Sequence, residues 1–448
     1  MKFAGQFNQS QLIFGKGHAE LHPYRGLVGY GPYSDPSDHF DEAVILHAPD
    51  DEASAEKLRS LLSDGLQPQF PRGFNQLFNS QVKITRLELS SSVTEEEKPH
   101  AFLEKFMESG ASGRLPIPII ERTPRGSFPS VYYDTKSLFV KEGLVTQIVT
   151  TQVLSNPDIL KWSLLPIAMQ LYTKMGGLPY VLYEKMRGQA QKSVTFVVGV
   201  GISRLQSRYG AGPAFVGFAL LFGPNGEWKI MKSEVRGYDR ATLAEMFKNL
   251  VRGVATTIFS HYIEESSVDA INLIIHYSGK NMSGEEERAL WAATSEMGSL
   301  YGKKILISVV KVGDSSYQAK VDGSACKDRM GLDTGLLTVG TTFEVKPHFF
   351  MMFTIGCLPL GDRYRATGLG SPAPILVSVK GIGGESGMDD GALLRSVFDF
   401  CRMNYSSVNN PVNRTPITVT YAREIAFLMG KLGLKEVPES VSSRLWFI

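Results

Sequence analysis

Hydrophobic and polar positions change their spacing from segment to segment along the first third of the chain. Short runs rich in β-branched residues predict strands at 43–47, 82–89, 117–121 and 145–151. Between these runs, apolar residues recur at helical spacing in the segments 51–63, 94–109 and 131–142. Strands that alternate with helices in this way are typical of βαβ units around a parallel sheet. The pattern therefore predicts an α/β chain that opens with a Rossmann-like domain.

A longer helix is predicted after these units. Asn156 is a good N-cap, Pro157 suits the first helical position, and Gly176-Gly177 ends the apolar face. Pro166 lies inside the helix and cannot donate a backbone hydrogen bond, so we expect a kink or one loosened turn there. The domain boundary is predicted between residues 183 and 192, which divides the chain into domains 1–185 and 186–448.

The second half of the chain has a different order of elements. Three strands come first, and the last two are joined across Pro224-Asn225-Gly226, which predicts an antiparallel meander. A helix, a strand, a second helix and another strand follow. The predicted elements are strands 194–202, 214–222 and 227–235, helix 240–263, strand 270–277, helix 284–301 and strand 304–310. This order matches an RNase H-like sheet.

Composition narrows the classes of protein to consider. The chain has 448 residues and a formal net charge of +2, so we expect any phosphate site to be local rather than part of a broad basic face. No stretch approaches the roughly 18 to 20 apolar residues of a membrane span. Residues 1–7 also lack the basic segment followed by an apolar run that marks a signal peptide. The three cysteines, an odd number and widely spaced, predict neither a zinc cluster nor a disulfide framework. We therefore expect a cytoplasmic protein.

Four polar residues of the first half form a candidate anion site. Tyr132 and Lys136 are four apart, so they share one face of a predicted helix near its N-terminus. Gln147 opens the next strand region, and Lys174 closes the following helix. Two ammonium groups, a phenol that can stack under a base and an amide suit a terminal phosphate. A tyrosine and a lysine at this spacing are also common on solvated helix faces, so spacing alone does not decide between the two interpretations.

These residues resemble a known family. The order Tyr132-Tyr133-x2-Lys136, then Gln147, then Lys174-Met-Gly-Gly-Leu-Pro is similar to the MID domain of Argonaute proteins. The resemblance implies that these residues clamp the 5′ phosphate of a guide strand. It also implies that the carboxylate of Ile448, at the end of an aromatic and apolar segment, joins Gln147 in holding Mg²⁺. Further matches are Gly31-Pro32-Tyr33, Gly199-Val-Gly201, His276-Tyr-Ser-Gly279-Lys and Pro416-Ile-Thr-Val-Thr-Tyr421-Ala.

The resemblance spans nearly the whole chain and leaves no room for separate N-terminal and PAZ domains, as in short prokaryotic Argonautes made of MID and PIWI. It implies a 5′-phosphorylated small RNA guide that recognises complementary DNA, in defence against plasmids or phages. The family further implies a partner effector with an APAZ region, fused to a sirtuin-like or TIR NAD-degrading domain. We expect that partner to be a separate protein.

The carboxylates that RNase H-type cutting requires are missing from the matching positions. Such cutting uses clustered acids to hold two metal ions. Gly201 stands where active members of the family carry the first aspartate, Ser278 where they carry the second, and Arg423 where they carry the last ligand. We therefore expect a PIWI domain that binds without cutting. The alternative is an active guide-directed nuclease that uses other acids, such as Glu234 or Asp239.

Basic residues near the same positions suggest a track for the guide and target backbones. They are Arg204, Arg208, Lys280, Arg414 and Arg423. Each residue taken alone is more typical of solvated surface, and only the group taken together makes a backbone track an equal alternative. A third interpretation is a Rossmann-type metabolic enzyme. The sequence counts against it, because Arg204 occupies the position of the third glycine in the dinucleotide-binding motif.

Overall fold

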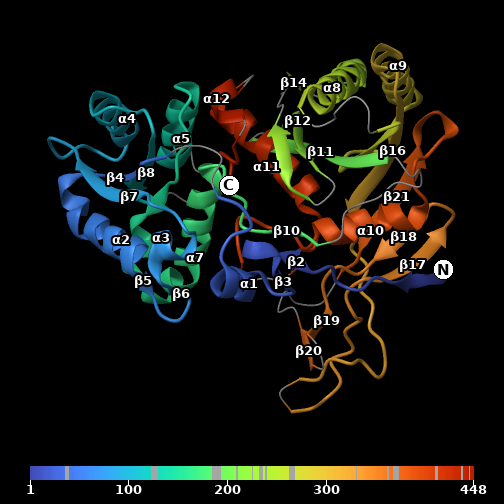
Figure 1. Cartoon of the computed structure of the whole chain (residues 1–448), viewed down its shortest axis with the longest axis horizontal. Helices are drawn as coiled ribbons and strands as arrows, with labels where there is room; N and C mark the ends of the chain where they lie inside the picture. Colours follow the sequence, from blue (N-terminus) through green and yellow to red (C-terminus); the bar gives the residue numbers. More distant parts are fainter. Residues whose placement is uncertain are drawn as a thin grey trace. The chain divides into compact units, whose positions relative to one another are not determined.

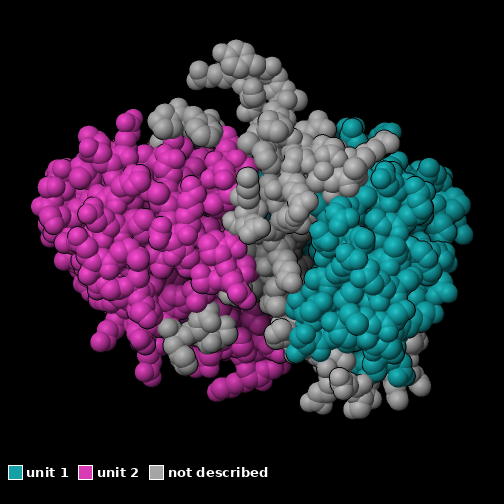
Figure 2. Space-filling view, turned by 90° about the horizontal axis from the view of Figure 1, so that it is seen from above, with its two compact units in different colours: residues 1–11, 182–404, 410–427 teal, residues 12–181, 405–409, 428–448 magenta. Residues whose placement is uncertain are grey.

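Two compact units make up the described part of the chain (Figure 2). The computed structural model describes residues 1–35, 40–122, 130–183, 193–207, 210–223, 226–231, 236–237, 240–261, 268–328, 330–360, 363–366, 373–408, 412–434, 437–442 and 444–448. Only the backbone is described for 203–207, 210–221, 228–231, 236–237, 240–242, 261, 360, 363 and 365. Unit 1 comprises 1–11, 182–404 and 410–427, and unit 2 comprises 12–181, 405–409 and 428–448. The chain passes between the units several times, and the predicted domains 1–185 and 186–448 stay a prediction.

Unit 2 contains a parallel sheet with helices around it (Figure 1). Its strand order is β7-β4-β8-β9, and every neighbouring pair is parallel, as predicted for the Rossmann-like part. The strands are β4 (Glu42–His47), β7 (Lys83–Glu88), β8 (Arg114–Ile120) and β9 (Val149–Thr150). The helices are α1 (Pro23–Tyr30), α2 (Glu52–Asp64), α3 (Gly73–Leu77), α4 (Lys98–Glu108), α5 (Val131–Lys141), α6 (Thr151–Ser155), α7 (Pro157–Lys174) and α12 (Glu439–Ser442).

The core of unit 2 explains why these segments form their elements. Val44 and Leu46 of β4 are buried and pack in one cluster with Phe102 and Phe106 of α4 and Phe139 of α5. A strand that is buried on both faces has a continuous run of apolar residues in its sequence, and β4 shows this pattern. The helices bury only one stripe, so they show helical spacing instead.

Helix α7 follows its sequence signals closely. The Asn156 side chain accepts hydrogen bonds from the backbone N–H groups of Asp158 and Ile159, so the predicted cap is confirmed. The helix runs through Pro166 to Lys174 as one element. Gly176, with φ of 87°, then allows the chain to turn away, because a left-handed backbone suits glycine.

Unit 1 is built on a ten-stranded mixed sheet of order β1-β17-β18-β21-β16-β15-β11-β12-β13, with β14 beside β12. The antiparallel pair β11–β12 and the parallel pairs β11–β15 and β15–β16 have the arrangement predicted for an RNase H-like sheet. The strands are β1 (Lys2–Gln6), β11 (Ser193–Ser207), β12 (Gly210–Phe222), β13 (Trp228–Met231), β14 (Arg236–Gly237), β15 (Ala270–Tyr277), β16 (Lys304–Asp314), β17 (Thr341–Lys346), β18 (Phe349–Met352) and β21 (Ile375–Gly381).

Helices cover both faces of this sheet (Figure 1). They are α8 (Arg240–His261), α9 (Gly284–Tyr301), α10 (Asp390–Phe400) and α11 (Ile417–Leu432), whose last turn is assigned to unit 2. Two successive residues of β15 show the arrangement, because neighbours on a strand point to opposite faces. The ring of Tyr277 meets that of Phe247 on α8 at 5.8 Å. His276 hydrogen-bonds Ser396 of α10 and Thr418 of α11.

Short segments complete the fold. The two-stranded pair β19 (Cys357–Leu360) and β20 (Arg363–Ala366) lies in unit 1, and β5 (Gly65–Leu66) pairs with β6 (Phe70–Pro71) in unit 2. Further short strands are β2 (Leu12–Ile13), β3 (Ala19–Glu20) and β10 (Val181–Leu182). The strand predicted at 145–151 is confined to β9, since residues 144–148 are irregular. No described helix is long and apolar enough to cross a membrane.

A loop between β16 and β17 corrects the expectation drawn from the cysteines. Cys326 and Cys357 form a disulfide, and Cys401 is a buried free thiol. The absence of a disulfide was therefore wrongly predicted, because an odd number of cysteines still allows one pair. Burial raises the pKa of the Cys401 thiol, and the charge of Asp399 adds to this shift.

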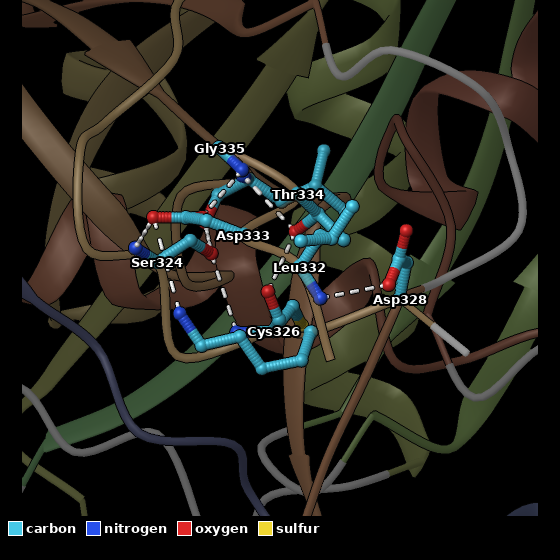
Figure 3. A network of polar contacts seen from close by, with 9 residues as sticks. Ser324, Cys326, Asp328, Leu332, Asp333, Thr334 and Gly335 are labelled. Carbon is cyan, nitrogen blue, oxygen red and sulfur yellow. Dashed lines mark hydrogen bonds and ion pairs between the residues drawn. The ribbon is translucent and has the colours of Figure 1, made fainter. Parts of the chain in front are cut away.

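Two aspartates hold the same loop in shape (Figure 3). Asp333 accepts hydrogen bonds from the backbone N–H groups of Ser324 and Gly335 at 2.9 and 2.8 Å. Asp328 accepts them from Met330 and Leu332, both at 2.8 Å. The backbone N–H of Gly335 makes the largest contribution to lowering the pKa of Asp333. These carboxylates therefore serve the turn itself, because side-chain acceptors can replace backbone partners in irregular segments.

Candidate functional site

The first part of the candidate site lies on α5. Tyr132 and Lys136 share a helix face as predicted, and the Lys136 Nζ lies 5.7 Å from the centre of the Tyr132 ring. The Lys136 side chain is 2% exposed, so it is buried rather than part of a solvated helix face. An ammonium group over an aromatic face is attracted by the ring's electrons. The structure thus rejects the solvated-face interpretation for Lys136.

A chain of polar contacts joins α7 to the segment before β9. Lys174 Nζ donates to Gln147 Oε1 at 2.5 Å, and both side chains are buried. Gln147 Nε2 donates to Gln170 Oε1 at 3.2 Å, and Gln170 Nε2 donates to the carbonyl of Ser406 at 3.0 Å. Each amide is therefore oriented by its neighbours, which leaves little freedom in the position of the Lys174 ammonium group.

Electrostatics make this cluster unusual. Burial lowers the pKa of Lys174 well below its ordinary value, and the charge of Lys136 lowers it further. Among the described residues, Lys174 has no carboxylate partner, and its hydrogen bond goes to a neutral amide oxygen. Buried charges are expensive unless an opposite charge or good hydrogen bonds compensate them. The cluster is consequently suited to receive an anion.

The C-terminal segment forms another side of the cluster. Trp446 is fully buried, and its ring centre lies 5.9 Å from Lys136 Nζ. Its indole nitrogen has no hydrogen-bond partner among the described residues. Figure 1 shows this end of the chain beside α5 and α7. Tyr132, Lys136, Gln147 and Lys174 thus lie in unit 2 together with the segment that ends at Ile448.

The side chains present do not by themselves fit a resident Mg²⁺ ion. Mg²⁺ prefers oxygen ligands, commonly carboxylates. Gln147 Oε1 already accepts from Lys174, and the pocket holds a second ammonium group on Lys136. Ile448 is half-buried, and none of the hydrogen bonds described for Gln147 goes to it. Searched over those residues, no group of three or more acids, histidines or cysteines is arranged to hold a metal ion.

A second location brings together the three positions matched to nuclease acids. A Cβ atom placed on Gly201 of β11 would lie 2.3 Å from the backbone nitrogen of Arg423 on α11. The hydroxyl of Ser278, just after β15, donates to the carbonyl of Val200 at 3.4 Å. Residues from three distant parts of the sequence therefore meet at one end of the sheet, as the resemblance requires.

The charges at this second location are mixed. Arg423 Nη1 lies 3.8 Å from Asp314 Oδ2, at the end of β16. The side chain of Asp314 is 59% exposed, so this ion pair is worth at most about 1 kcal/mol. Glu234 and Asp239, the acids considered for an active nuclease, lie outside the described residues.

The proposed basic track is only partly visible. Lys280 is exposed after β15. Arg414 donates through Nη2 to the carbonyl of Ser315 at 3.0 Å, so part of its guanidinium holds a loop. The side chain of Arg204 and the whole of Arg208 lie outside the described residues. The track stays a prediction.

Sequence reasoning missed three residues that the structure places at these locations. Gln170 lies one helical turn before Lys174, and that spacing on an otherwise apolar helix face is a signal that could have identified it. Trp446 was recognised only as part of an apolar ending. Asp314 had no distinguishing pattern, because its pairing with Arg423 depends on how β16 and α11 come together.

Comparison with known proteins agrees with this geometry. Residues 125–316 match the model of the Piwi domain family. The chain is 23% identical over 456 residues to "Protein argonaute" of Cereibacter sphaeroides, covering 94% of this chain and 55% of that protein. The chain therefore spans little more than half the length of this relative.

Solved structures show the same fold. Drosophila Piwi matches 99% of this chain and 56% of its own, with a TM-score of 0.71 and 13% identity. Clostridium butyricum Argonaute, solved with a guide DNA and a 19-mer target DNA, matches 100% of this chain and 55% of its own, with a TM-score of 0.66 and 16% identity. At these identities the likeness concerns the fold.

Proposed function

We propose, from the premise that this chain is an Argonaute homologue with a Piwi domain, that it anchors the phosphorylated 5′ end of a guide strand. The site is formed by Tyr132, Lys136, Gln147 and Lys174. The observation that carries the proposal is the buried Lys174, which has an amide oxygen as its hydrogen-bond partner and the charge of Lys136 nearby. A terminal phosphate would bring negative charge next to Lys174, whose described hydrogen-bond partner is a neutral amide oxygen.

Each residue has a distinct part in the proposed binding. The phosphate dianion favours the charged form of Lys174, whose pKa is depressed in the empty pocket, so binding is accompanied by proton uptake. Gln147 and Gln170 keep the Lys174 side chain oriented. Tyr132 offers a ring for the first base, because aromatic side chains stack on bases of any sequence. Mg²⁺ with Gln147 and Ile448 stays a prediction, and no step above depends on it.

The proposed guide is a short 5′-phosphorylated RNA that pairs with complementary DNA, and the chain holds this pair without cutting it. Gly201, Ser278 and Arg423 support the second statement, because a glycine, a serine and an arginine supply none of the carboxylates that a two-metal site requires. The close approach of α11 to Gly201 also leaves no room there for an aspartate side chain.

The consequence of target recognition would then come from another protein. We place the chain as the sensor subunit of a prokaryotic antiviral or anti-plasmid system. The effector with an APAZ region, sirtuin-like or TIR, would be its partner in the cytoplasm. Co-expression with candidate effectors followed by gel filtration tests this step, and co-elution is expected. Failure of every such effector to co-elute with guide-loaded protein would remove the partner from the proposal.

The test of the phosphate site is extraction of the nucleic acid that purifies with the protein. We expect short strands that polynucleotide kinase labels at the 5′ end only after phosphatase treatment. Lys136→Glu with Lys174→Glu should abolish retention, whereas Lys141→Glu should retain the guide. Lys141 is the matched control because it is an exposed lysine of the same helix. Equal retention by all variants would refute the site.

A cleavage assay separates the proposal from its alternative. Guide-loaded protein is incubated with a labelled complementary strand and Mg²⁺ or Mn²⁺. The proposal expects an intact target that stays bound. A defined cut opposite the guide would instead establish an active nuclease that uses acids other than those matched here.

A further inference from the structure

A separate cavity in unit 2 is lined by polar side chains. It has a volume of about 420 Å³, within the range of small-molecule sites. Six polar residues define the Tyr30–Tyr33 pocket, which are Lys16, Tyr30, Tyr33, Arg72, Gln76 and Asn79, and Ser34 and the carboxylate of Asp35 also line it. All six are exposed, and their side chains have no hydrogen-bond or ion-pair partner among the described residues. The floor is buried and apolar, formed by Leu27, Pro32 and Leu77.

Backbone strain is concentrated at the same pocket. Four described residues other than glycine have a left-handed backbone, and three of them, Lys16, Arg72 and Asn79, line it. Their φ angles are 57°, 80° and 49°. Such conformations cost free energy and persist where the surroundings impose them, often at binding sites. The strain thus independently marks the residues that also carry the free polar groups.

Described contacts position the ring of Tyr30 and the backbone of Tyr33. The Tyr30 ring stacks on His18, with ring centres 4.4 Å apart and planes 11° apart, and is still 44% exposed. The backbone N–H of Tyr33 donates to the Pro179 carbonyl at 3.0 Å, and the Tyr33 side chain is 37% exposed. Gly31, with φ of 77°, makes the turn between the two tyrosines. The motif Gly31-Pro32-Tyr33 therefore builds one wall of the pocket.

We propose that the Tyr30–Tyr33 pocket binds one nucleoside phosphate, either a free nucleotide or an unpaired nucleotide of a bound strand. Partly exposed aromatic rings suit a base, because stacking is the usual way to hold an unpaired base. Lys16 and Arg72 suit its phosphate, and the amides of Gln76 and Asn79 can both donate to and accept from base edges. The cavity is too small for a duplex, which limits the ligand to a single nucleotide.

This site is distinct from the phosphate site around Lys174, so the probes must carry no 5′ phosphate. Adenosine 3′-monophosphate tests the free-nucleotide source, and a single-stranded RNA tetramer with a 5′ hydroxyl tests the strand source. Binding is measured by isothermal titration on the full chain. Tyr33→Ala and Lys16→Glu should each weaken binding of at least one probe roughly tenfold.

Two controls keep the result interpretable. Tyr317→Ala removes a tyrosine that is 64% exposed elsewhere, and Lys141→Glu changes an exposed lysine of α5 outside the pocket, so both should bind the probes within about twofold of the parent. Saturable binding that Tyr33→Ala and Lys16→Glu weaken supports the pocket, and the probe that binds identifies the source. No saturable binding of either probe, or binding that neither variant changes, overturns it. Retention of 5′-phosphorylated guides is measured in a separate experiment. A negative result for the Tyr30–Tyr33 pocket can therefore be distinguished from a negative result for the 5′-phosphate site.

Discussion

Lys174 Nζ donates to Gln147 Oε1 at 2.5 Å, and both side chains are almost completely buried. A buried amine whose hydrogen bond goes to a neutral oxygen adds little stability, because burial disfavours its charged form. A bound anion would favour that charged form. Four properties of the chain follow from such local arrangements and can be measured.

Replacement of Lys174 by methionine should separate stability from binding. Removal of the amine relieves the cost of burying it, and the oxygen left unpaired on Gln147 costs about 1–3 kcal/mol. We therefore expect a free energy of unfolding within about 1 kcal/mol of the parent value, with guide retention lost. Urea titration and nucleic-acid extraction measure the two quantities. Leu171→Ala, at a fully buried position of the same helix, should cost about 2–5 kcal/mol and calibrates the scale. A comparable loss for Lys174→Met would contradict this interpretation.

Alanine at position 201 should destabilise unit 1. Its Cβ would lie 2.3 Å from the Arg423 backbone nitrogen, so β11 and α11 must move apart, at a cost of about 1–3 kcal/mol. Gly313→Ala is the matched control, because the nearest atom to its Cβ would be 3.9 Å away in the same sheet. That variant should be neutral or gain up to about 1 kcal/mol. Thermal unfolding compares the two, and equal melting temperatures would show that α11 adjusts freely.

His276 should make stability depend on pH in acid. Burial lowers its pKa from the ordinary 6.5 to about 3, so between these values the unfolded chain binds more protons than the folded one. The free energy of unfolding should therefore fall as the pH drops from 6.5 toward 3, by up to about 1.4 kcal/mol per pH unit. Urea titrations at pH 7 and pH 5 measure the slope.

The control for this pH dependence is an exposed histidine. His348 pairs with Asp390 at the surface, so His348→Asn should leave the slope nearly unchanged. His276→Leu should reduce the slope and also lower stability at neutral pH, because the hydroxyl of Thr418 loses its partner. An unchanged slope in His276→Leu would assign the acid sensitivity to other groups.

Loss of the Asp333 carboxylate should open the loop in Figure 3. Asp333→Ala removes the acceptor of the N–H groups of Ser324 and Gly335, so hydrogen exchange at these amides should accelerate severalfold. Asp322→Ala, at an exposed residue of the same loop, should not change their exchange. Mass spectrometry of peptides covering 322–336 provides the measurement. Slow exchange in Asp333→Ala would mean that other contacts define the loop.

Local patterns in the sequence were sufficient for the elements that carry the candidate phosphate site. The period of apolar residues placed α5 and α7, and the Asn156 cap and Gly176-Gly177 stop set the bounds of α7. Helical geometry alone put Tyr132 and Lys136 on one face. These successes share one reason, which is that each depends on residues within a few positions of each other.

Contacts between segments that are distant in the sequence could not be predicted from local patterns. The disulfide of Cys326 with Cys357 depends on where a long loop returns, and the Tyr30–Tyr33 pocket on how 15–35 packs against 72–79. Gln170 was overlooked because its role depends on the position of Gln147.

The sequence by itself determined the order of the elements, the family resemblance and the residue types at positions 201, 278 and 423. Only the tertiary structure decided that Lys136 and Lys174 are buried in one cluster and that Gly201 meets the backbone of Arg423. The physical reason is that a residue becomes buried, or closely approached by another, only when two surfaces pack together. A sequence pattern specifies the face that each element presents, and only packing specifies which face it meets.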